Sequence, residues 1–181
     1  RLNELDDELM RSVQGEDSTP HVVHTFEWGV DHGTPFEVQE FVVSGSLGEL
    51  VEREGPHQSL DRTLGILEEM CSAFEHFHGR GLVHRDIKPQ NVLVRSLDPL
   101  DLVLSDFGLA TRVERSRTMR SGSRAPAYGA LMAAWGDVSS GRDWWSLGIM
   151  LVEFLTGSHP FRRPDGSWME DAEIGNHLSI R

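Results

Sequence analysis

Residues 84–91 read HRDIKPQN, and residues 106–108 read DFG. The two strings contain four polar side chains suited to the transfer of a phosphoryl group. Asp86 could accept the proton of a hydroxyl nucleophile, and Lys88 could stabilise the charge that moves. Asn91 offers an amide oxygen and Asp106 a carboxylate, and both are hard ligands for Mg²⁺. Two such ligands suffice, because Mg²⁺ fills the rest of its octahedron with water and phosphate oxygens.

HRDIKPQN followed by DFG resembles the catalytic loop and the metal-binding motif of the protein kinase family. The resemblance implies that Asp86 is the catalytic base and that Asn91 and Asp106 bind the metal ions. It also implies that Lys88 contacts the γ-phosphate of ATP. A lysine two residues after the aspartate is typical of Ser/Thr kinases rather than Tyr kinases. The expected cofactors are therefore ATP and Mg²⁺, and the expected partner is a protein substrate.

Upstream of the catalytic loop, residues 40–42 resemble the hinge whose backbone groups hydrogen-bond adenine. The resemblance implies nucleotide contacts at Glu40 and Val42, and it puts Gln39 at the gatekeeper position. Residues 44–47 are similar to the glycine-containing turn after the hinge. Within that turn, Ser46 is expected to lie near the ribose.

Downstream, residues 143–148 are similar to the start of the helix that anchors the catalytic loop. In this family the aspartate, here Asp143, hydrogen-bonds the backbone of the loop, whereas His84 is expected to pack beneath it. Arg85 makes the chain similar to kinases that pair this arginine with a phosphate on the activation segment. Thr118 or Ser116 is the expected acceptor of that phosphate.

The order of the predicted elements, short strands first and helices afterward, favours an α+β fold. Leu2, Leu5 and Leu9 recur at helical spacing, and DHG at 31–33 reads as a hairpin turn. The family resemblance implies a two-lobe fold, with a partial N-lobe over 1–43 and a partial, mainly helical C-lobe over 44–181. The predicted helices are 2–14, 47–53, 60–77 and 144–155, and the predicted strands are 21–28, 36–43, 91–94 and 102–104.

The sequence departs from the family pattern at both ends. No glycine-rich loop and no VAIK-type lysine precede the hinge, and the chain does not begin with Met, so we expect it to start inside a longer protein. The first helix should carry the glutamate that pairs with that lysine, and the candidates are Asp6, Glu4 and Glu8. Residues 130–132 read ALM where the family has APE, which is expected to weaken substrate binding or the substrate lobe. Residues 1–181 alone are expected to be inactive.

Composition excludes some classes of protein. The net charge of −12 argues against a nucleic-acid partner, because binding phosphates requires a basic surface. A single cysteine, Cys71, cannot form an internal disulfide, which favours the cytoplasm; we read it as a buried, small apolar residue. The longest apolar run, about 147–155, is too short to cross a bilayer and contains Glu153. A membrane anchor outside residues 1–181 remains compatible with the sequence.

These observations predict an ATP-dependent Ser/Thr protein kinase. The main alternative is a pseudokinase, a binding or scaffolding module that keeps the fold without transferring phosphate. The missing APE favours this alternative, whereas the intact Asp86, Lys88, Asn91 and Asp106 oppose it. A small-molecule kinase fits less well, because such enzymes tend to lack the KPxN string. The compact, insert-free layout resembles bacterial members of the family.

Overall fold

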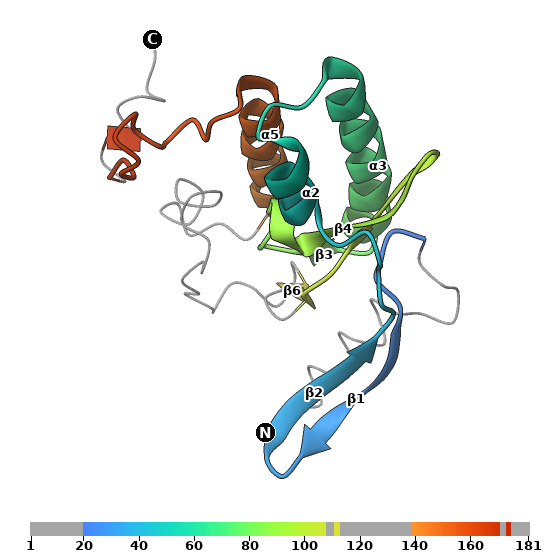
Figure 1. The fold of residues 1–181 in the computed structure, drawn as a ribbon. Coiled ribbons are helices and arrows are strands. Elements are labelled where there is room, and N and C mark those ends of the chain that lie inside the picture. The colour runs from blue at the N-terminus through green and yellow to red at the C-terminus, as the bar shows by residue number, and fades with distance from the viewer. Residues whose placement is uncertain (1–19, 108–110, 113–138, 171–172, 175–181) are drawn as a thin grey trace.

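The computed structural model describes residues 20–107, 111–112, 139–170 and 173–174. Within these residues, a β-hairpin projects from a body made of three α-helices, a 3₁₀ helix and two further strand pairs (Figure 1). The α+β class predicted from the sequence is confirmed. The elements are β1 (Thr25–Asp31), β2 (Thr34–Gln39), α2 (Leu47–Glu54), α3 (Leu60–His78), β3 (Leu82–Val83), the 3₁₀ helix η1 (Pro89–Asn91), β4 (Val92–Leu97), β5 (Leu100–Leu104), β6 (Thr111–Arg112) and α5 (Gly141–Thr156).

The projecting hairpin pairs β1 with β2 in antiparallel register, from Thr25 opposite Gln39 to Asp31 opposite Thr34. Its two-residue turn has positive φ at both positions, 47° at His32 and 84° at Gly33. This is the turn geometry whose twist matches that of paired strands, and glycine reaches the second position without strain. The predicted hairpin turn is therefore confirmed.

The run predicted as one strand over 21–28 divides between two partners. Its second half forms β1, whereas residues 21–23 lie alongside the last residue of β5. The Val23 N–H donates to the Leu104 carbonyl, the Leu104 N–H donates to the His21 carbonyl, and both distances are 2.9 Å. The hairpin is thereby attached to the strand that leads to Asp106.

The main core lies between α3, α5 and the β4–β5 pair. α3 begins at its N-cap Ser59, whose hydroxyl accepts the Arg62 N–H at 3.2 Å. α5 ends at Gly157, which adopts a φ of 73° that favours glycine. The core side chains that are at most 1% exposed include Leu47, Ile66, Met70, Phe74, Leu82, Ile87, Leu104, Leu147, Met150 and Phe154.

The helical spacing of six apolar residues predicts one buried face for α3, and this prediction was partly wrong; the six are Leu64, Leu67, Met70, Cys71, Phe74 and Phe77. Leu64 is 47% exposed, and Cys71 is only half-buried. The buried residues of α3 are Thr63, Ile66, Met70, Ala73, Phe74 and Phe77. These residues form one stripe that faces α5 and β5, and Leu64 lies outside it.

Other predicted boundaries also shift. Residues 40–43 leave the strand after Gln39, residue 91 belongs to η1 rather than to a strand, and α5 begins three residues earlier than predicted, at Gly141. The short pair β3–β6 was not predicted, because two-residue strands carry too little periodicity to be recognised. The predicted helix over 2–14, the acceptors Ser116 and Thr118, and residues 130–132 lie outside the described residues.

We expect Phe154→Ala to lower the free energy of unfolding by about 3–5 kcal/mol, because it empties a fully buried position between α5 and α3. Leu155→Ala is the matched control on the same helix, since Leu155 is 39% exposed and should cost less than about 1 kcal/mol. Urea denaturation measures both values. Equal losses would contradict the assigned orientation of α5.

The last turn of α3 carries a histidine whose charge is disfavoured in the folded state. Burial, then the charge of Arg80, then that of His21 lower the pKa of His76 below its ordinary value of 6.5. His76 Nδ1 lies 3.0 Å from Arg80 Nη1, a contact that suits a neutral ring accepting a hydrogen bond. The unfolded chain therefore binds this proton more readily than the folded protein does.

The lowered pKa of His76 predicts that the free energy of unfolding declines as the pH falls below 6.5 and levels off below the folded pKa. In His76→Gln this part of the decline should disappear. His32→Gln, at the exposed hairpin turn, is the control and should keep the wild-type profile. Denaturation series at several values between about pH 5 and about pH 8 measure the effect. Parallel curves of unfolding free energy against pH for the wild type and His76→Gln would refute the prediction.

Candidate functional site

A single buried carboxylate at the start of α5 holds the backbone of residues 84–85. Asp143 is 1% exposed, and its two oxygens accept the His84 N–H at 2.9 Å and the Arg85 N–H at 2.8 Å. His78, at the end of α3, places its Nε2 2.9 Å from the same carboxylate. The contact predicted between Asp143 and the loop is therefore present. The histidine is a third partner that the sequence analysis missed.

These hydrogen bonds hold the backbone in a conformation that it would otherwise rarely adopt. Arg85 has a φ of 72°, in the left-handed region that costs a non-glycine residue energy. Such a residue persists only where its surroundings fix it, and Asp143 provides that restraint. The carboxylate thus determines the direction in which the chain enters residues 86–91.

Two arginines lie in this buried, charged region. Burial and the charge of Arg142 lower the pKa of Arg85. Burial lowers the pKa of Arg142 as well, although the carboxylates of Asp143 and Asp86 oppose this shift. Arg142 is 3% exposed, and the sequence analysis missed it, because a polar residue before the apolar part of a helix gives no periodic signal.

Asp86, Lys88 and Asn91 form one hydrogen-bonded group. Lys88 Nζ lies 2.7 Å from Asp86 Oδ2. Asn91 Nδ2 donates to the Asp86 carbonyl at 2.8 Å and to Asp86 Oδ2 at 2.9 Å. Asp86 is 5% exposed, and its other oxygen, Oδ1, has no hydrogen-bond partner among the described residues. One carboxylate oxygen is thus fixed from two sides, while the second is open to a further donor.

His84 links this group to the segment that carries Asp106. Its Nε2 contacts the Ser105 carbonyl at 3.0 Å, and its Nδ1 accepts the Asp86 N–H at 3.3 Å. The ring is 2% exposed and packs 4.8 Å from the ring of Phe107. His84 is therefore structural, as predicted. The family resemblance implies that Phe107 packs against the first helix, predicted over 2–14, which is not among the described residues. In the described part of the chain, the Phe107 ring lies 5.3 Å from that of Phe77.

Asp106 lies directly after two hydrogen bonds that tie its neighbour to Asn91. The Ser105 N–H and hydroxyl donate to the Asn91 carbonyl at 3.0 Å and 3.3 Å. Asp106 itself is exposed and has a φ of 60°. Partial burial, and next the charge of Asp106, raise the pKa of Glu37 on β2. The charge of Asp106 thus acts on a carboxylate of the projecting hairpin.

The predicted hinge connects the hairpin to α2. The Glu40 N–H donates to the His24 carbonyl at 2.8 Å, and the Glu40 carboxylate binds Arg95 and accepts the His24 N–H. Partial burial acts to raise the pKa of Glu40, but the hydrogen bonds from Arg95 and His24 outweigh it and hold the pKa below its ordinary value. Across the described residues, no hydrogen bond engages the Glu40 carbonyl or the Val42 N–H.

Ser46 begins α2 as its N-cap and is 7% exposed. Its hydroxyl accepts the Glu49 N–H at 3.2 Å, and its own N–H donates to Glu49 Oε2 at 2.7 Å. This reciprocal pair is a capping box. The hydroxyl that was predicted to lie near a ribose is thus engaged by the helix, and its role toward a nucleotide stays a prediction.

The sequence of residues 5–180 matches the profile of the family described as "Protein kinase domain". The chain belongs to the protein kinase family. The α+β, two-lobe kinase fold expected from the catalytic-loop strings is therefore correct.

Curated relatives come from bacteria and from eukaryotes. The serine/threonine-protein kinase PrkC of Bacillus subtilis is 31% identical over 88% of this chain and 25% of its own length. Serine/threonine-protein kinase 33 of Bos taurus is 31% identical over 89% of this chain and 34% of its own length. Calcium/calmodulin-dependent protein kinase type I of Schizosaccharomyces pombe is 28% identical over 89% of this chain and 49% of its own length. The chain thus spans between a quarter and a half of the length of these relatives.

The described residues lack two features that would be informative about function. They contain no cluster of three or more His, Cys, Asp or Glu side chains able to hold a metal ion. No helix among them is long and apolar enough to cross a membrane.

Asp143→Asn should lower the free energy of unfolding by about 2–5 kcal/mol, because an amide cannot accept both buried N–H groups and places its NH₂ against one of them. Asp31→Asn, at the exposed end of β1, is the control and should change stability by less than about 0.5 kcal/mol. Urea denaturation at constant pH measures both. An Asp143→Asn protein as stable as the control would show that this carboxylate does not hold the loop.

Proposed function

We propose that this kinase domain transfers the γ-phosphoryl group of Mg-ATP to serine and threonine hydroxyls of protein substrates. The observation that supports the proposal is that the two carboxylate oxygens of Asp86 differ in their hydrogen bonding. Lys88 and Asn91 hold Asp86 Oδ2, while the buried Oδ1 has no partner in the described part of the chain. A substrate hydroxyl is a donor that would satisfy this oxygen.

In the proposed reaction, the oxygen of the substrate hydroxyl bonds to the γ-phosphorus while Asp86 accepts the proton of that hydroxyl. The bond between the γ-phosphorus and the bridging oxygen breaks, and ADP leaves. Lys88 lies 2.7 Å from the same carboxylate, so its ammonium group can reach the transferred phosphoryl group and offset its charge. Asn91 keeps Asp86 in place through two hydrogen bonds from its amide nitrogen. Positioning and electrostatic stabilisation supply most of the catalysis in such a reaction.

The described residues fit a magnesium–nucleotide complex. Asn91 uses only its Nδ2 for internal hydrogen bonds, so its Oδ1 is available as a ligand together with the exposed Asp106 carboxylate. When bound, Mg²⁺ would neutralise phosphate charge. At the hinge, the Glu40 carbonyl and the Val42 N–H form an acceptor–donor pair suited to the edge of adenine. Ser46 remains a predicted neighbour of the ribose.

Asp86→Asn should lower kcat by about two to four orders of magnitude while leaving the Kd for Mg-ATP close to wild type, because it removes the base but keeps the nucleotide contacts. Asp106→Asn should instead abolish Mg-dependent transfer, because it removes the carboxylate ligand of the metal. The measurement is ³²P transfer from γ-labelled ATP to a generic protein, using the native protein with whatever sequence flanks residues 1–181.

Asp31→Asn is the control for both variants, since Asp31 lies at the exposed end of β1, at the hairpin turn. An Asp86→Asn enzyme with full activity would refute the role given to this carboxylate. A native protein that binds Mg-ATP but transfers no phosphate would instead favour the pseudokinase alternative.

A further inference from the structure

The turn after the hinge, residues 42–46, is fixed from several sides. The Gly45 N–H donates to the Val42 carbonyl at 3.0 Å, and Gly45 has a φ of 76°, which closes the turn. The Gly45 carbonyl accepts the Val94 N–H of β4 at 2.8 Å. These backbone bonds connect the predicted adenine-binding segment to the strand that follows Asn91.

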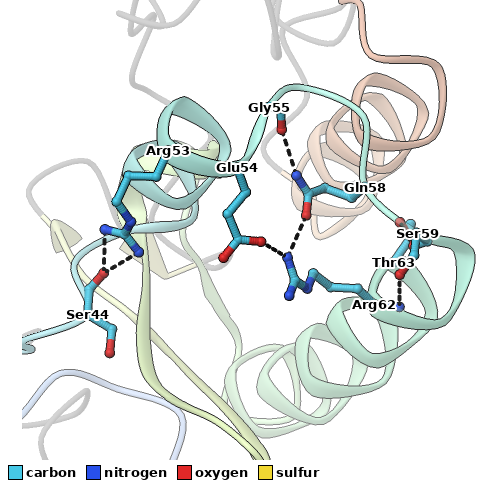
Figure 2. A network of polar contacts seen from close by, with 8 residues as sticks. All are labelled: Ser44, Arg53, Glu54, Gly55, Gln58, Ser59, Arg62 and Thr63. Atoms are coloured by element: carbon cyan, nitrogen blue, oxygen red, sulfur yellow. Dashed lines mark hydrogen bonds and ion pairs between the residues drawn. The ribbon is translucent and has the colours of Figure 1, made fainter.

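Two side chains of α2 also form hydrogen bonds with the turn at residues 42–46. In its first turn, the capping box between Ser46 and Glu49 holds the end of the hinge turn. In its last turn, Arg53 reaches back along the helix, and its Nη1 and Nη2 both donate to the Ser44 carbonyl at 3.3 Å (Figure 2). Hydrogen bonds from a charged donor are stronger than neutral ones.

From this arrangement we infer that Arg53 is a positioning residue for the nucleotide: it orients the Ser44 peptide and thereby the hinge groups at Glu40 and Val42. The inference rests on the proposed function, because it assumes that adenine binds these hinge groups. Ser44 lies only two residues after Val42, so a rotation of its peptide changes the path of the hinge. Within the described part of the chain, Arg53 provides the side-chain contact to the Ser44 carbonyl.

Arg53 also has a favourable electrostatic position on α2. A cation in the last turn of a helix interacts well with the helix dipole, and Arg53 lies four residues after Glu49 on the same face. The N–H and hydroxyl of Ser46, together with the nearby charge of Arg53, hold the pKa of Glu49 below its ordinary value. The ionised Glu49 and the charged Arg53 therefore restrain the two ends of the turn together.

A second arginine nearby provides a matched control. Arg62 on α3 binds the Glu54 carboxylate and donates to Gln58 Oε1 at 2.9 Å, while Gln58 Nε2 donates to the Gly55 carbonyl at 2.7 Å (Figure 2). These contacts tie the end of α2 to the start of α3 and do not touch the hinge turn. Arg62→Gln thus removes a comparable arginine from the neighbouring network without removing a hinge contact.

The test compares the native protein with Arg53→Gln, Arg53→Lys and Arg62→Gln, using the KM and the directly measured Kd for Mg-ATP together with kcat. Arg53→Gln should raise both KM and Kd roughly threefold to tenfold at unchanged kcat, the loss expected when the charge-assisted hydrogen bonds to one solvent-exposed carbonyl are removed. Arg53→Lys keeps the charge and one donor, so it should restore part of the affinity. Arg62→Gln should match the wild type in KM, Kd and kcat.

Unchanged KM and Kd in Arg53→Gln would overturn the inference and leave the proposed function standing. So would a fall in kcat at constant KM, or an equal rise in KM in Arg62→Gln, which would indicate a general loosening of α2. A wild-type protein that binds no Mg-ATP would overturn the proposed function itself, and with it the inference. Hydrogen exchange over residues 41–46 provides an independent readout, and it should be faster in Arg53→Gln than in Arg62→Gln.

Discussion

The site depends on the interaction between the Asp143 carboxylate and the backbone N–H groups of His84 and Arg85. A buried carboxylate is costly unless its oxygens are hydrogen-bonded, and here two backbone donors and His78 satisfy it. In return, the loop accepts a left-handed residue at Arg85. From that point the chain can enter η1 with Asp86 and Asn91 facing each other. The geometry of the proposed catalytic group thus follows from a residue about 60 positions away in the sequence.

The other polar groups of the candidate site come from several helices, strands and loops. His84 connects the loop to Ser105 and therefore to the position of Asp106. The Arg95 guanidinium on β4 binds the Glu40 carboxylate and donates to the carbonyls of residues 20 and 22. The same side chain therefore contacts both the hinge and the segment that precedes the hairpin. The nucleotide and the metal would consequently meet groups held by β4, β5 and α2 together.

Much of the site could be predicted from the sequence, because its residues are local in the chain. HRDIKPQN places Asp86, Lys88 and Asn91 within six consecutive residues, and hydrogen bonds join them in the structure. The long helices were also predicted, since periodic apolar residues over many positions are a strong signal. The exposure of Leu64 was missed, because periodicity alone does not show that α3 packs against two neighbours.

Contacts between distant segments were harder to predict. Residues 21–23 pair with β5 although their composition is equally typical of a continuous β1, and only the tertiary arrangement decides between the two. His78 and Arg142 approach the site from α3 and α5, and neither of them belongs to a local motif. Arg53 looks in the sequence like an ordinary surface residue of a helix, and its contact with the Ser44 carbonyl becomes visible only when the hinge turn is folded beside α2.

The most direct test of the account is phosphoamino-acid analysis of a protein substrate after incubation with the native kinase, γ-³²P-labelled ATP and Mg²⁺. The account predicts that the label appears on phosphoserine and phosphothreonine and that it disappears when Mg²⁺ is chelated. Label on phosphotyrosine or on small metabolites, or no Mg-dependent transfer to protein at all, would contradict it.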